Sequence, residues 1–133
     1  MPAPPFLDSN ILIYAYSTDA RSRVAQSLCE APHILSVQSL NEFASVARRK
    51  IGFPWDRVID SLIDVAALAD RIIPLTFELH QLGLAVANRY DLQIYDAMIV
   101  AAALEADCDT LFSEDMHDGL VIEDRLIIRN PFA

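Results

Sequence analysis

The chain alternates short apolar runs with longer segments whose apolar residues recur at helical spacing, and this alternation limits its possible folds most strongly. Parallel strands need long crossover connections, which are usually helices. The sequence therefore predicts an α/β fold, a short twisted parallel sheet of about four or five strands flanked by helices. The predicted strands span residues 6–7, 33–36, 71–76, 110–112 and 126–129. The predicted helices span residues 11–16, 21–30, 39–50, 54–68, 77–90 and 95–106.

Length and composition indicate one globular domain over residues 1–133, with 53% hydrophobic and 22% charged residues. No apolar run approaches the roughly 18–20 residues that span a bilayer, so we expect no membrane segment. The first residues lack the positive start and apolar stretch of a secretory signal, which predicts a cytoplasmic protein. Cys29 and Cys108 lie far apart without a nearby cysteine, and we expect two reduced thiols.

Several classes of site are excluded by motifs that the sequence lacks. Its three glycines form no phosphate-binding loop, and no G-x-S-x-G serine-hydrolase motif occurs. Its three histidines show no zinc-binding spacing. The net charge of −9 argues against nucleic-acid binding, unless divalent cations supply the missing positive charge.

Four acidic residues fall where an α/β sheet usually places its site, at the carboxyl ends of strands or the start of the adjoining helices. Asp8 ends the first predicted strand, and Glu42 lies early in the helix after the second. Asp96 begins the helix before the fourth strand, and Asp115 follows that strand. Clustered carboxylates repel one another, and a hard divalent cation with oxygen ligands removes that repulsion. The pattern favours a metal site that acts on phosphodiesters.

Each acid also has a simpler interpretation. Asp8 and Asp96 are suitable helix N-caps, Glu42 suits an exposed helix face, and Asp115 suits a turn. Their joint placement at one end of the sheet favours the metal site.

Together these segments resemble the PIN-domain family, in particular the toxin ribonucleases of VapBC toxin–antitoxin pairs. Residues 6–14 (FLDSNILIY) are similar to the family's opening motif, and residues 39–43 (SLNEF) to its second. Residues 95–103 (YDAMIVAAA) resemble the third motif, and residues 111–116 (LFSEDM) the fourth. All four occur in family order over essentially the whole chain. The fourth departs modestly, with residues 116–119 (MHDG) where many relatives have an aromatic residue.

The resemblance implies a metal site of Asp8, Glu42, Asp96 and Asp115 that binds Mg²⁺ or Mn²⁺. It implies that Ser113 lies beside this site. It also implies hydrolysis of RNA, with tRNA as a common target, by a homodimer that a cognate antitoxin inhibits. Asn10 is implied to hold the first loop in place.

Rival interpretations with the same fold fail at named positions. A phosphate-accepting receiver domain needs two adjacent acids after the first strand and a late lysine, whereas Lys50 is the only lysine. A haloacid-dehalogenase-type phosphatase needs D-x-D, and here Asn10 takes the third place. The remaining alternative is a catalytically silent PIN-like module that binds a protein or RNA partner.

Residues around these motifs have open roles. Asp118 and His117 suit a solvated loop, with a fifth acid and a substrate contact as the alternatives. The basic run 48–50 suits a helix C-terminus or a phosphate-contacting patch. For Tyr14, Tyr16 and Trp55 we expect packing in a dimer face, with stacking on bases as the alternative.

Overall fold

The computed structural model describes residues 3–133 and confirms the α/β fold. Met1 and Pro2, which begin the predicted domain and the N-terminal segment considered above, lie outside the described residues. The sheet consists of β1 (Phe6–Leu7), β2 (Ile34–Ser36), β3 (Arg71–Ile73), β4 (Thr110–Phe112), β5 (Val121–Ile122) and β6 (Leu126–Arg129). The helices are α1 (Ser9–Ala15), α2 (Ser22–Glu30), α3 (Val37–Val46), α4 (Trp55–Leu68), α5 (Phe77–Tyr90) and α6 (Ile94–Glu105), with a π-helical turn η1 (Ala47–Ile51) after α3.

The strands form one sheet in the order β3-β2-β1-β4-β6-β5, parallel except where β5 pairs with β6. β5 is a sixth strand that the sequence pattern did not predict. The turn between β5 and β6 contains Glu123 and Asp124 at φ 54° and 57°, and Arg125 N–H donates to the Ile122 carbonyl oxygen. This backbone is that of a hairpin turn, but it lacks the usual Asn-Gly signal.

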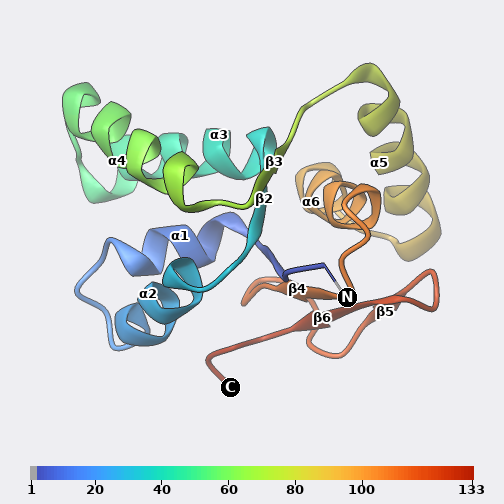
Figure 1. Cartoon of the computed structure of the whole chain (residues 1–133). Helices are drawn as coiled ribbons and strands as arrows, with labels where there is room; N and C mark the ends of the chain where they lie inside the picture. The colour runs from blue at the N-terminus through green and yellow to red at the C-terminus, as the bar shows by residue number, and fades with distance from the viewer. Residues whose placement is uncertain (1–2) are drawn as a thin grey trace.

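The sheet separates two apolar clusters, because successive strand residues point to opposite faces. Phe6 and Ile34 belong to the cluster under α5 and α6, whereas their neighbours Leu7 and Leu35 belong to the cluster under α1 to α4. Figure 1 shows the two groups of helices on either side of the strands. α6 is apolar on every side, with residues 97–104 all buried, as expected for a helix in the middle of the core.

The predicted elements are present, with ends that differ by a few residues. β3 ends at Ile73 rather than at residue 76, because Pro74 has no N–H for the ladder. α3 begins at Val37, earlier than predicted, because Ser36 and Ser39 form a capping box. The following π-helical turn is capped by Gly52, whose φ of 83° is left-handed.

The strand order switches sides of β1 between β3 and β4. β2 and β3 extend the sheet on one side of β1, and β4 and β6 extend it on the other, all in parallel. The carboxyl ends of β1, β2 and β4 therefore meet at one edge, the position where open α/β sheets bind ligands. In the described part of the chain, no helix combines the length and apolarity needed to cross a bilayer.

Candidate active site

Asp8 directly follows β1 and is the most buried acid of the predicted set, with 3% of its surface exposed. It caps α1, because its Oδ1 accepts a hydrogen bond of 2.7 Å from Ser9 N–H. Its Oδ2 accepts hydrogen bonds from Ser113 Oγ at 2.8 Å and from Asn10 Nδ2 at 3.3 Å. The capping role considered from the sequence is confirmed, and it uses Oδ1 but not Oδ2.

Glu42 lies in the second turn of α3 and is half-buried, unlike the exposed helix glutamate considered from the sequence. Its Oε1 accepts a 2.8 Å hydrogen bond from Ser9 Oγ, and its Oε2 accepts one of 2.8 Å from Gln38 Nε2. Ser9 therefore connects Glu42 to Asp8, because its backbone N–H and its hydroxyl reach one carboxylate each.

Asp96 lies in the first turn of α6 but is not its N-cap, so that alternative is wrong. Gln93 caps the helix, with its Oε1 accepting from the N–H groups of Tyr95 and Asp96. Among residues 3–133, no hydrogen bond reaches the half-buried Asp96 carboxylate. Its carboxylate oxygens are therefore available for a ligand.

Asp115 lies beyond β4 and is exposed. Asn10 holds the loop after β4 against α1, because Nδ2 donates to Asp115 Oδ2 at 3.2 Å and Oδ1 accepts from Glu114 N–H at 3.3 Å. The fully buried Ser113 completes this link, accepting from Asp115 N–H while donating to Asp8. These bonds join Asp115 to Asp8 through two polar side chains.

The acids are close enough to perturb one another. Burial raises the pKa of Asp8 from 3.8 to about 7; hydrogen bonds from Ser113 and Ser9 oppose this rise, and the charges of Glu42 and Asp96 add to it. The pKa of Asp96 is also raised, by burial first and then by the charges of Glu42 and Asp115. All four predicted acids therefore share one electrostatic environment.

These carboxylates suit a hydrated divalent cation better than a closed metal cage. Within residues 3–133, no three His, Cys, Asp or Glu side chains are arranged to hold one ion together. Mg²⁺ keeps several waters and commonly binds proteins through one or two carboxylates. The oxygens of Asp8 and Asp96 have the donor chemistry for such an ion, and a bound cation would favour the ionised form that burial disfavours.

Glu42 and Asp96 line a hollow in the surface. Its lining residues are Gln38, Asn41, Glu42, Ser45, Arg49, Gln93, Tyr95 and Asp96. Arg49 supplies the cation of this lining, and its Nε donates to Ser45 Oγ at 3.1 Å rather than to a carboxylate. This acidic hollow can admit an anionic group only if bound cations offset its carboxylates.

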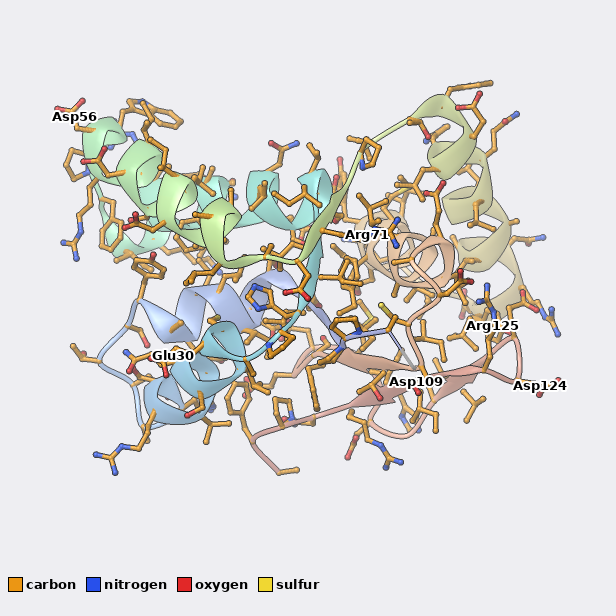
Figure 2. The ribbon with its side chains drawn as sticks, viewed as in Figure 1. Glu30, Asp56, Arg71, Asp109, Asp124 and Arg125 are labelled. Atoms are coloured by element: carbon orange, nitrogen blue, oxygen red, sulfur yellow. The ribbon has the colours of Figure 1, made fainter. Side chains whose placement is uncertain are left out.

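Acidic side chains outside the cluster are spread over the surface. Figure 2 shows Asp56 at the start of α4 and Asp124 in the turn between β5 and β6, at opposite ends of the molecule. The net charge of −9 is therefore not concentrated at the site.

Sequence reasoning named Asn10 and Ser113 but missed Gln38 and Glu114 among the polar side chains around the acids. Gln38 precedes Glu42 by one helical turn, and this spacing could have indicated it. Glu114 gave no local signal: its carboxylate accepts from Tyr14 Oη at 2.7 Å and pairs with Arg21 at 2.9 Å, both distant in sequence.

The structure places the loop residues Asp118 and His117 and the basic run 48–50, whose roles the sequence left open. Asp118 and His117 are exposed, and Asp118 accepts a hydrogen bond from Asn130 N–H rather than facing the other acids. Within the basic run, Arg49 lines the acidic hollow, whereas Arg48 lies over the ring of Trp55.

The three aromatic residues considered from the sequence differ in their surroundings. Tyr14 and Tyr16 pack edge-on against Phe132 and Phe43 of the same chain. Trp55 is 56% exposed, and its packing in a dimer face stays a prediction. Both cysteines are free, with Cys108 buried and Cys29 half-buried.

Comparisons with known proteins agree with the α/β fold described above. A family model described as the PIN domain matches residues 6–117. No curated protein matches the chain by sequence. Among solved structures, a toxin–antitoxin complex from Klebsiella pneumoniae covers 96% of this chain and 97% of its own, with a TM-score of 0.71 and 20% identity.

Two further structures are similar. Mycobacterium tuberculosis VapC20, described as a toxin that cleaves the sarcin–ricin loop, covers 83% of this chain and 90% of its own, with a TM-score of 0.65 and 19% identity. VapBC2 from Rickettsia felis, solved with a DNA fragment from its promoter, covers 94% of this chain and 96% of its own, with a TM-score of 0.66 and 18% identity. At these identities the likeness shows a shared fold.

Proposed function

The chain belongs to the PIN-domain family, and on that premise we propose that it is a divalent-metal-dependent endoribonuclease, with Asp8, Glu42, Asp96 and Asp115 as its site. The observation that carries this proposal is the burial of Asp8 beside Glu42 and Asp96, which raises the pKa of Asp8 to about 7. Buried like charges are costly without a cation, and phosphodiester cleavage is a reaction that uses such a cation.

Each residue has a task that follows from its contacts. Asp8 and Asp96 are the proposed direct ligands for Mg²⁺ or Mn²⁺, with the remaining positions taken by water. When bound, such an ion activates water for attack and offsets charge on the phosphate. Ser113 holds Asp8 Oδ2 in place, and Gln38 and Ser9 fix the two oxygens of Glu42.

Glu42 and Asp115 are the other two carboxylates of the site, and a carboxylate beside the metal can accept a proton from the attacking water. Glu42 is held on both oxygens, whereas Asp115 is exposed and bound through Asn10. We assign the proton-accepting role to one of these two residues.

We further propose that the protein is the toxin of a toxin–antitoxin pair, one domain that acts on cytoplasmic RNA as a homodimer. The support is the fold shared with the Klebsiella and Rickettsia complexes over nearly the whole chain. In this role a cognate antitoxin binds the protein and blocks the acidic hollow.

Cleavage of labelled structured RNA tests the proposed activity. The substrates are a total tRNA pool, as the resemblance suggests, and a sarcin–ricin loop hairpin, because one structural neighbour cleaves that loop. Each is incubated with Mg²⁺, Mn²⁺ or EDTA. We expect cutting that requires metal and is lost in Asp96→Asn, a change of similar shape at a carboxylate with no hydrogen bond among the described residues.

The matched control is Asp60→Asn, at an exposed position on α4. It removes one negative charge without touching the site, so it should cut like the wild type. Cutting by Asp96→Asn at the wild-type rate would mean that the site is misassigned. No metal-dependent cutting of any RNA by the wild type would favour a catalytically silent partner-binding module.

A further inference from the structure

A second hollow lies next to the acidic one and shares part of its wall. Its lining residues are Gln38, Leu75, Thr76, Phe77, His80, Ile94, Tyr95 and Met98. Gln38 and Tyr95 line both hollows. Gln38 also donates to Glu42, and Tyr95 immediately precedes Asp96, so the second hollow adjoins the proposed cleavage site directly.

This second hollow presents exposed aromatic rings. Phe77 is 69% exposed and Tyr95 is 57% exposed, although large aromatic side chains are usually well buried. The imidazole of His80 stacks with Phe77, with ring centroids 6.2 Å apart and an interplanar angle of 27°. Flat rings exposed beside a nuclease site are suited to stacking on bases.

The charges that line the two hollows also favour a nucleic-acid strand. None of the residues that line the aromatic hollow is acidic, in a chain with a net charge of −9. On the acidic hollow, Arg49 lies in the same lining as Glu42 and Asp96 and donates through Nε to Ser45. A strand can thus place one phosphate near Arg49, another at the acids, and a base on the rings.

We propose that the aromatic hollow binds one unpaired nucleobase of the RNA substrate, stacked on Phe77 and Tyr95 beside the cleaved phosphodiester. This assignment rests on the proposed nuclease function and deepens it, because it makes an unpaired nucleotide next to the cut a requirement. The lining residues that the two hollows share favour a substrate strand over a protein partner, since a strand must extend beyond the cleaved bond.

Binding of a short single-stranded oligoribonucleotide tests the assignment. The probe is about eight nucleotides long and contains 2-aminopurine, whose fluorescence falls when it stacks on an aromatic ring. The parent protein carries Asp96→Asn so that the probe is not cut. Into it are introduced Phe77→Ala, Phe77→Trp, which keeps a stacking ring, and Trp55→Ala, a control at a residue that is 56% exposed on α4.

We expect Phe77→Ala to weaken binding about tenfold and to remove the fluorescence change, because one base–aromatic stack is lost. Phe77→Trp should retain both, and Trp55→Ala should match the parent. Equal binding by Phe77→Ala, or no binding by the parent, would overturn the assignment. So would a change from dimer to monomer caused by Phe77→Ala in sedimentation, which would assign the hollow to contact with a second copy.

RNA cleavage measured in parallel separates this assignment from the proposed function. Metal-dependent cutting by the wild type, together with unchanged cutting and binding on Phe77→Ala, would reject the stacking site and leave the nuclease intact. No cutting of any RNA by the wild type would reject the nuclease, and a base site beside its cleaved bond with it.

Discussion

Replacing the buried carboxyl of Asp8 tests the electrostatic account of the site. Asp8→Asn keeps the oxygen that accepts from Ser9 N–H but removes the charge. Burial raises the pKa of Asp8 from 3.8 to about 7. Ionisation of Asp8 therefore costs the folded protein about 4 kcal/mol of stability, since one pKa unit is worth about 1.4 kcal/mol. Asp8 is only 3% exposed, so solvent screens little of this cost.

Whether stability rises or falls with pH depends on whether the folded or the unfolded protein binds the proton of Asp8 more tightly. The folded protein binds the proton of Asp8 more tightly than the unfolded chain, so its contribution to stability is complete below pH 3.8 and is lost as pH rises through about 7. Without metal, the wild type should therefore lose about 4 kcal/mol relative to Asp8→Asn across this range. The raised pKa of Asp96 acts in the same direction in both proteins.

Urea unfolding in EDTA, followed by circular dichroism at several pH values, measures this difference. Asp60→Asn, at an exposed position, should follow the wild type at every pH. A constant difference in unfolding free energy between the wild type and Asp8→Asn from acidic to alkaline pH would refute the reasoning. It would mean that the carboxyl of Asp8 ionises as freely in the folded protein as in the unfolded chain.

Three further substitutions test the surroundings of the site. Ser113→Ala removes the hydroxyl that donates to Asp8 Oδ2, so urea unfolding at pH 8 should show a loss of about 1–3 kcal/mol. Gln93→Ala removes the cap of α6 and should cost about 1 kcal/mol in thermal unfolding, which Gln93→Ser should largely restore. Gly83→Ala would place a Cβ 2.3 Å from Met98 Sδ and should cost about 1–3 kcal/mol. In a Met98→Ala background the same change should cost nothing, and an equal cost there would refute the contact.

The spacing of apolar residues and the positions of prolines and helix caps were enough to predict most of the fold. The bounds of α5 agree with the predicted helix because Thr76 caps it after Pro74 has ended β3. The four acids were predicted together because parallel strands align their carboxyl ends, a rule that needs only strand order along the chain. Each of these signals lies within a few residues of the feature it predicts.

The remaining features depend on contacts between distant segments. Ser9 joins Asp8 to Glu42, which lies 33 residues from Ser9, and no local pattern predicts that pairing. Local preference favours aspartate over glutamine as an N-cap, so Asp96 was considered where Gln93 performs the role. The hollow beside Phe77 forms only when α5, α6 and the start of α3 come together.

The central claim is that the four acids Asp8, Glu42, Asp96 and Asp115 form one divalent-metal site. Direct binding of Mn²⁺, followed by electron paramagnetic resonance, is its most direct test. The free ion gives a strong signal that weakens on binding to protein. The account predicts saturable binding by the wild type, loss of that binding in Asp8→Asn, and retention in Asp60→Asn. Equal Mn²⁺ binding by Asp8→Asn and the wild type would contradict it, because the buried carboxylate would then have no part in holding the ion.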